Sequence, residues 1–114
     1  MQVLDAESPH LIALQPAVTP TETAVGEDGL TIGRGSGCQV VVPSPVVSRL
    51  HAQIERAGAR FQLRDLGSIN GTYVNGTRVH VTYLLSNYDL IGLGEASAQL
   101  TFVDMERLGQ PRDA

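Results

Sequence analysis

The sequence predicts an all-β domain, either a β-sandwich or a β-barrel, and three observations support this prediction. Short apolar or alternating runs follow one another along the chain and are separated by Gly, Pro, Asn and Asp, as in β proteins. No window keeps the 3.6-residue apolar period of a helix of ordinary length. The chain has 114 residues, enough for one domain with a single hydrophobic core.

Ten runs are predicted strands because they are short, apolar or alternating, and bounded by turn-forming residues. In chain order they are HLIAL, TETAV, LTIG, QVVV, HAQIER, RFQLRDL, TYVN, TRVH, DLIGL and AQLTFV. In RFQLRDL, Phe61 and Leu63 alternate with polar residues. One face of this strand is therefore predicted to be buried until the chain turns at Asp65.

The dipeptide Asn-Gly occurs twice, at Asn70 and Gly71 and again at Asn75 and Gly76. Both residue types tolerate positive φ, so Asn-Gly is the strongest short-range signal for a hairpin turn. Tight turns are therefore predicted at both places.

The domain is predicted to span residues 9–105, with no linker inside it and with flexible ends at residues 1–8 and 106–114. No apolar run approaches the ~18 residues that a membrane span needs. The first residues lack the basic region and the small-residue cleavage site of a signal peptide. A cytoplasmic protein without a membrane partner is therefore expected.

The charges are unevenly distributed, although the net charge of −4 argues against a general nucleic-acid binder. Between residues 34 and 78 there are six arginines against Glu55 and Asp65, and the chain contains no lysine. Guanidinium groups suit bidentate recognition of phosphate or carboxylate, while a bias in genome composition explains the missing lysines equally well. Aromatic residues are few and tryptophan is absent, so base stacking against a nucleic acid is not expected.

The glycine-rich stretch TIGRGSGCQVVV does not fit a nucleotide-binding loop, because a strand and a proline follow the glycines where a helix is needed. Arg34 lies in this stretch, at a turn of small residues that a ligand can approach closely. The alternative is a solvated turn arginine. Cys38 is the only cysteine, which excludes an internal disulfide and a thiolate metal cluster.

Ser48 and His51, three residues apart in SRLHAQ, raise the question of a catalytic pair or a metal site. No nucleophile-elbow motif surrounds Ser48, and no acidic residue has a spacing that indicates an orienting partner for His51. His10 and His80 lie in unrelated segments, so no metal-ligand cluster is indicated. We expect neither an enzyme nor a metal or cofactor site, and we expect both ring nitrogens of His51 to be hydrogen-bonded.

Four motifs in order resemble the forkhead-associated (FHA) domain family. They are IGR, SRLHA, LRDLGSINGTYVNG and DLIGLG, and the likeness extends over residues 30–103. The preceding HLIAL and TETAV look like the first strands of that fold. The resemblance implies an eleven-stranded β-sandwich whose loops at one end bind a phosphothreonine peptide.

The resemblance also implies a role for each site residue. Arg34 would pair its guanidinium with phosphate oxygens, and the Ser48 hydroxyl would donate a hydrogen bond to the same phosphate. Arg49 would add charge near the phosphate or contact an adjacent peptide residue. Ser68 and Asn70, on the GSINGT loop, are also assigned to the peptide-binding site, where the Asn70 amide would bond the peptide backbone and fix its register.

Other residues are expected to support the site without binding the peptide. Gly33 and His51 resemble the structural pair of the family, and Gly71 and Asn75 are assigned the same supporting role. Asp65, together with Asn75, is expected to brace the loops.

The implied partner is a protein that carries a phosphothreonine, made by a Ser/Thr kinase in the same cell, and the domain is expected to act as a monomer. The alternative is a sandwich that binds an unphosphorylated partner through a sheet face. Thr19, Thr21 and Thr23 lie near an acidic residue and raise a third idea, phosphorylation of this segment and its capture by the domain's own site. The TETAV run favours a strand there instead.

Overall fold

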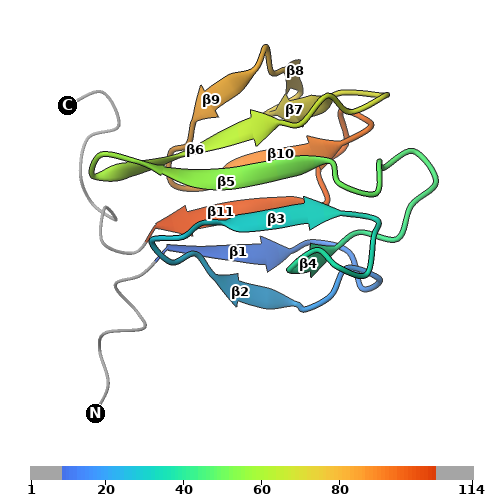
Figure 1. Cartoon of the computed structure of the whole chain (residues 1–114), viewed down its shortest axis with the longest axis horizontal. Helices are drawn as coiled ribbons and strands as arrows, with labels where there is room; N and C mark the ends of the chain where they lie inside the picture. Colours follow the sequence, from blue (N-terminus) through green and yellow to red (C-terminus); the bar gives the residue numbers. More distant parts are fainter. Residues whose placement is uncertain (1–8, 105–114) are drawn as a thin grey trace.

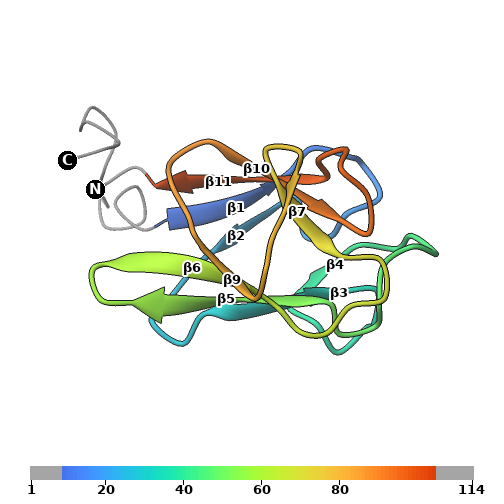
Figure 2. The same ribbon diagram turned by 90° about the horizontal axis from the view of Figure 1, so that it is seen from above.

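Strands with one apolar face must cover that face, and this protein does so by stacking two β-sheets. The structure is a computed structural model that describes residues 9–104. Eleven strands form a six-stranded and a five-stranded sheet, which Figure 2 shows as two layers. Within residues 9–104 there is no helix that could cross a membrane.

The six-stranded sheet is built from β1 (Pro9–Ala13), β2 (Glu22–Ala24), β7 (Thr72–Val74), β8 (Thr77–Arg78), β10 (Asp89–Leu93) and β11 (Leu100–Asp104). Its strand order is β2-β1-β11-β10-β7-β8. The five-stranded sheet is built from β3 (Leu30–Gly33), β4 (Val40–Val41), β5 (Ala52–Ala57), β6 (Arg60–Asp65) and β9 (Thr82–Leu84). Its strand order is β4-β3-β5-β6-β9. Paired strands are antiparallel, apart from the parallel pair of β3 and β4.

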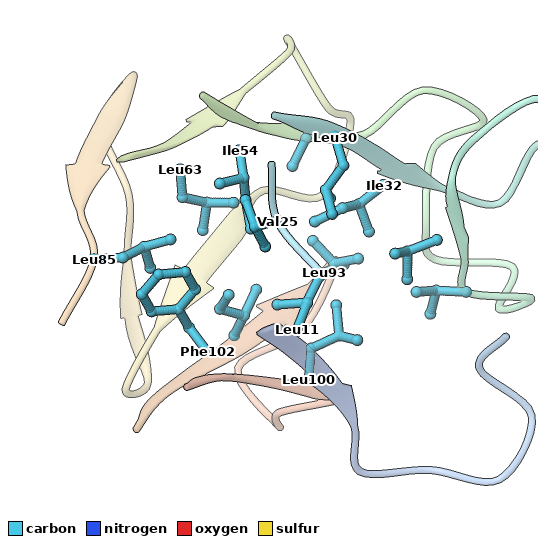
Figure 3. Close-up of a cluster of buried hydrophobic side chains, with 14 of the residues drawn as sticks. Leu11, Val25, Leu30, Ile32, Ile54, Leu63, Leu85, Leu93, Leu100 and Phe102 are labelled. Atoms are coloured by element: carbon cyan, nitrogen blue, oxygen red, sulfur yellow. The ribbon is translucent and has the colours of Figure 1, made fainter. Parts of the chain in front are cut away.

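The core lies between the two sheets and follows the alternation of the strands. In β6, Phe61 and Leu63 are buried as predicted. The Phe61 ring lies 6.4 Å, centroid to centroid, from that of Phe102 in the opposite sheet. Figure 3 shows the aliphatic and aromatic side chains that fill the space between the sheets: Leu11, Val25, Leu30, Ile32, Ile54, Leu63, Leu85, Leu93, Leu100 and Phe102. Burying one such side chain stabilises the fold by roughly 1.5–3 kcal/mol.

The predicted all-β fold and the eleven-stranded sandwich are confirmed, and each of the ten predicted runs contributes a strand. The eleventh strand, β9, was missed by the residue pattern. It is three residues long, lies at the edge of its sheet, and leaves Tyr83 and Leu84 exposed. The strand itself therefore shows no alternation of buried and exposed residues.

The two Asn-Gly dipeptides have different structures. Asn75 and Gly76 form the tight turn between β7 and β8, with φ of 52° and 83°. Asn70 and Gly71 instead end the connection that takes the chain from β6 in one sheet to β7 in the other, and only Gly71 has a positive φ, of 92°. The hairpin signal describes dihedral tolerance, so it cannot tell a hairpin from a crossing between sheets.

The connections β3–β4, β4–β5, β6–β7 and β10–β11 gather at one end of the sandwich, on the right of Figure 1. They comprise residues 34–39, 42–51, 66–71 and 94–99. A backbone bridge between Thr19 and Val41 holds β4 from its outer side. Thr23 lies within β2 and its hydroxyl is buried. The predicted flexible segments, 1–8 and 106–114, lie outside the described residues.

Candidate functional site

The β3–β4 loop is docked on the last part of the β4–β5 connection, at Ser48 and Arg49. The Arg34 amide donates to the carbonyl oxygen of Ser48 at 3.0 Å, and the Gly35 amide donates to that of Arg49 at 3.0 Å. A β-carbon on Gly33 would overlap the Arg49 carbonyl, so this close approach requires glycine. Hydrogen bonds and close contact therefore tie the two loops together as one unit.

His51 joins the same unit to the β6–β7 loop from a fully buried position. Its Nδ1 accepts a hydrogen bond from the Ser48 amide at 3.0 Å, and its Nε2 lies 2.8 Å from the carbonyl oxygen of Gly71. A backbone amide only donates and a carbonyl only accepts, so the ring is the neutral tautomer with its proton on Nε2. Burial lowers the pKa of His51, which keeps the ring neutral.

Gly71 and Asn70 connect two further loops. The Gly71 carbonyl also accepts the Gly94 amide at 2.8 Å, while Asn70 Nδ2 donates to the Val46 carbonyl at 2.9 Å. A β-carbon on Gly94 would overlap that Val46 carbonyl, so the β10–β11 turn fits here only with glycine at this position. Asn70 is thereby fixed at the meeting point of three loops.

The Asp65 carboxylate holds the β6–β7 loop through hydrogen bonds. It accepts bonds from the hydroxyls of Ser68 at 2.6 Å and Thr72 at 2.7 Å, and from the amides of Gly67 at 3.1 Å and Ser68 at 3.2 Å. Burial by itself raises the pKa of Asp65, but these four hydrogen bonds outweigh it and lower the pKa below its ordinary value. The carboxylate is therefore ionised at neutral pH and holds the loop in one conformation.

Ser68 was predicted to bind the peptide, but in the structure its hydroxyl belongs to this bracing network. Its hydroxyl donates to Asp65 and accepts the Gly71 amide at 3.0 Å, so both of its functions are used inside the loop. Asn75, by contrast, lies at the other end of β7. Its amide bonds Asp89 at 3.0 Å and the Leu90 amide at 2.9 Å, so it braces the β7–β8 turn and is not brought together with the other predicted site residues.

The side chains of Arg34 and Ser48 have hydrogen-bond donors without a partner within residues 9–104. Arg34 Nε donates to the Val47 carbonyl at 2.9 Å, which fixes the side chain and leaves both Nη groups without a hydrogen-bond partner among residues 9–104. The Ser48 oxygen accepts the Ile69 amide at 3.2 Å, while its proton has no acceptor in the described part of the chain. The exposed Arg49 side chain likewise makes no hydrogen bond or ion pair there.

The four loops carry two arginines, Arg34 and Arg49, against one carboxylate, Glu95. Within residues 9–104, carboxylates pair with Arg56, Arg64 and His10, none of which lies in the four loops. Arg34 and Arg49 have no carboxylate partner in that part of the chain. Unpaired guanidinium groups on an exposed loop cluster attract an anion.

The FHA domain family model matches residues 30–94 of the chain, which is more than half of its length. The chain belongs to the forkhead-associated domain family. The predicted family is thus confirmed. An FHA domain is a binding module and not a catalytic one.

Two curated relatives are mycobacterial. The ABC transporter ATP-binding/permease protein Rv1747 of Mycobacterium tuberculosis is 38% identical over 73 residues, which cover 64% of this chain and 8% of the relative. FhaB of the same species is 25% identical over 91 residues, covering 80% of this chain and 59% of the relative. The chain therefore spans less than two thirds of the length of either protein.

Solved FHA structures share the whole sandwich. The FhaA FHA domain complexed with the intracellular domain of Rv3910 has 32% identity and a TM-score of 0.72, with 83% of this chain and 99% of that chain covered. The MEK1 FHA domain in complex with a HOP1 phosphothreonine peptide has 26% identity and a TM-score of 0.71, with 85% and 96% covered.

The geometry of this FHA domain does not assemble a nucleophile and its base. His51 Nδ1 is occupied by the backbone amide of Ser48, not by its hydroxyl, and Nε2 is occupied by Gly71. His51 therefore cannot take the Ser48 proton. Within residues 9–104, His, Cys, Asp and Glu do not cluster in threes as a metal site would require. Cys38 Sγ donates to the Arg49 carbonyl, and burial raises the pKa of this thiol.

Some groups that position the side chains of the FHA loop cluster are backbone amides and carbonyls, and residue type does not reveal their role. The Ile69 amide positions Ser48, and the Val46 carbonyl positions Asn70. Ile69 itself is 85% exposed, so its side chain faces solvent. In the sequence, the DLIGLG motif indicates part of this arrangement, because its last glycine is Gly94, whose backbone packs against the Val46 carbonyl.

Proposed function

We propose that this FHA domain binds phosphothreonine peptides and thereby recruits proteins that a Ser/Thr kinase has phosphorylated. One observation carries the proposal. The Nη groups of Arg34 and the hydroxyl of Ser48 are hydrogen-bond donors without a partner within residues 9–104, and they lie on loops that buried hydrogen bonds tie together. The two relatives of known structure that are described with a protein or phosphothreonine peptide bound support it.

Arg34 and Ser48 bind the phosphate in this proposal. The two Nη groups of Arg34 form a bidentate pair with phosphate oxygens, and the Ser48 hydroxyl donates a further bond. Arg49, exposed beside Ser48, adds a second positive charge. Hydrogen bonds to charged groups contribute about 1.5–3 kcal/mol each, so the phosphate supplies most of the affinity of a short peptide.

Asn70 reads the peptide backbone. Its Nδ2 is already held by the Val46 carbonyl, and its Oδ1 accepts a peptide amide in the proposed complex. Gly33, His51 and Gly71 keep the three loops in place, with Ser68 and Asp65 bracing the third. Because these groups are positioned before binding, little ordering entropy opposes the association.

The wider proposal is a non-enzymatic signalling module, monomeric and cytoplasmic, whose domain spans residues 9–105. All eleven strands fall within residues 9–104, which supports those boundaries. The net charge of −4 and the scarcity of aromatic residues support a protein partner over a nucleic acid or an anionic membrane surface.

An oriented phosphothreonine peptide library, followed by calorimetric titration of the selected peptide and its unphosphorylated twin, tests the proposal. We expect the selected peptide to bind and the twin to show no measurable binding. Equal binding of the twin would replace the proposal with its alternative, a sandwich that recognises an unphosphorylated partner through a sheet face.

A further inference from the structure

Arg78 places a third guanidinium against the ligand loops. It lies on β8, directly opposite Tyr73 of β7. A β-carbon added to Gly71 would lie 2.7 Å from Nε and 2.8 Å from Cζ of Arg78. The exposed Arg78 side chain is therefore folded over the Gly71 backbone. Gly71 follows Asn70 directly, so the charge sits beside the residue proposed to hold the peptide.

Nothing in the described part of the chain explains this position as an internal pairing. The Arg78 side chain makes no hydrogen bond or ion pair with another residue of the 9–104 region. Arg64, an arginine of the same sandwich, shows the contrast, because both its Nε and Nη2 bond Glu55. The donors of Arg78 are thus available to a ligand.

The distance to the phosphate position is set by the loop itself. The Ile69 amide bonds the Ser48 hydroxyl, and Gly71 comes two residues later. Two residues of chain span at most about 7 Å. Tyr73 reaches the same place from β7, since its hydroxyl lies 3.3 Å from the Asn70 carbonyl. A peptide whose phosphate bonds Ser48 and whose backbone bonds Asn70 therefore passes within reach of Arg78.

We propose that Arg78 is a specificity-determining residue that binds a second anionic group on the same peptide, within three residues of the phosphothreonine. The inference rests on the proposed phosphopeptide function and specifies its substrate class, peptides that carry a carboxylate or a second phosphate. Both groups present paired oxygens that match the planar fork of a guanidinium. Such a surface contact is screened by salt, because the Debye length is about 8 Å at physiological ionic strength.

The test is a calorimetric comparison of the parent, Arg78→Gln and Arg56→Gln. Arg78→Gln keeps most of the side-chain stem over Gly71 while removing the charge. Arg56→Gln removes an equal charge at the far end of β5, where Arg56 pairs with Glu27. The peptides are a phosphothreonine peptide with alanine flanks, versions with a single aspartate at each of the three positions on either side, and matching versions with phosphoserine.

We expect at least one acidic position to raise the affinity of the parent about three- to ten-fold, and Arg56→Gln to keep this gain. Arg78→Gln should bind the alanine-flanked peptide as the parent does and lose the gain. If only phosphoserine gives the gain, the second group is a phosphate; if aspartate also does, carboxylates are included.

Three outcomes would overturn the inference while leaving the proposed function standing. They are the absence of any acidic preference in the parent, an equal preference in Arg78→Gln, and an equal loss for all peptides in Arg78→Gln, which would make Arg78 a brace for Gly71. If no phosphothreonine peptide binds the parent, the proposed function itself fails, and the inference fails with it.

Discussion

Replacing His51 with alanine removes the two hydrogen bonds that join the Ser48 segment to the Gly71 loop. Each bond contributes about 1 kcal/mol, and a buried donor left without a partner costs about 1–3 kcal/mol more. The Gly71 carbonyl keeps its bond from Gly94, so only the Ser48 amide loses its one partner. The expected loss in the free energy of unfolding is therefore roughly 3–5 kcal/mol.

For a domain near 100 residues, each kcal/mol lowers the melting temperature by about 4–8 °C, so His51→Ala should melt at least ~12 °C below the parent. His80→Ala is the matched control, because His80 is exposed and lies outside the four loops. Calorimetric melting measures both. A His51→Ala variant that melts like the parent but no longer binds a phosphopeptide would show that His51 contacts the ligand directly, and the structural assignment would be wrong.

The same ring predicts a pH dependence. Because burial lowers the pKa of His51 in the folded state, the unfolded chain takes up this proton at a higher pH than the native protein does. The stability associated with the neutral ring is therefore complete above the unfolded pKa of about 6.5 and decreases as the pH falls below it. The parent should lose more stability than His51→Ala between about pH 7.5 and pH 5.5. Parallel melting curves across this range would contradict the sign.

Four further predictions concern the site. Arg34→Ala should weaken phosphopeptide binding about 10- to 100-fold, because its lost bonds to the peptide are to a charged group. Its melting temperature should fall by only about 4–8 °C, because the one internal bond lost is that from Arg34 Nε to the Val47 carbonyl; unchanged affinity by calorimetry would remove Arg34 from the phosphate site. Phosphoserine should bind several-fold more weakly than phosphothreonine, since the proposed complex packs the threonine methyl between the phosphate-binding loops and one buried methyl contributes ~0.8 kcal/mol. A glutamate peptide should bind more weakly still, with fewer charges and oxygens; equal titration curves would refute either ranking. Asp65→Asn should lower the free energy of unfolding at neutral pH, because the carboxylate that braces the loop is lost. Since folding lowers the pKa of Asp65, the difference in unfolding free energy between parent and variant should shrink as the pH falls through that depressed pKa. A difference that grows as the pH is lowered would contradict this.

The strand pattern was predictable wherever a strand has a buried face. β6 alternates Phe61 and Leu63 with polar residues, and this alternation alone located it. β9 could not be located in this way, because Tyr83 and Leu84 are exposed on an edge strand of three residues. Its position depends on pairing with β6, a long-range contact that local composition does not encode.

The site was predictable at the level of side-chain type and not at the level of backbone geometry. Arg34, Ser48 and Asn70 were assigned from the resemblance to FHA domains, and all three lie in the loop cluster. Ser68 has the same hydroxyl as Ser48, and only the structure shows that Asp65 and the Gly71 amide already use it. Every residue carries a backbone amide and carbonyl, so the contributions of such groups depend on tertiary structure alone.

The folding of Arg78 over Gly71 belongs to the same class of information. An arginine after an Asn-Gly turn is unremarkable as sequence, and its guanidinium reaches the ligand end only because β7 and β8 pair with Arg78 opposite Tyr73. Cross-strand register thus determines which charges face the peptide.

The central claim is that the loop cluster, and not a sheet face, is the binding surface. A titration of the isotope-labelled chain with a phosphothreonine peptide, followed by backbone amide NMR, tests it most directly. The account predicts that the largest shifts fall on residues 34–35, 48–50 and 69–71, above all on the Ile69 amide that bonds Ser48, and that they are absent with the unphosphorylated peptide. Shifts concentrated on the exposed residues of β9 and β10, equal with and without the phosphate, would contradict it.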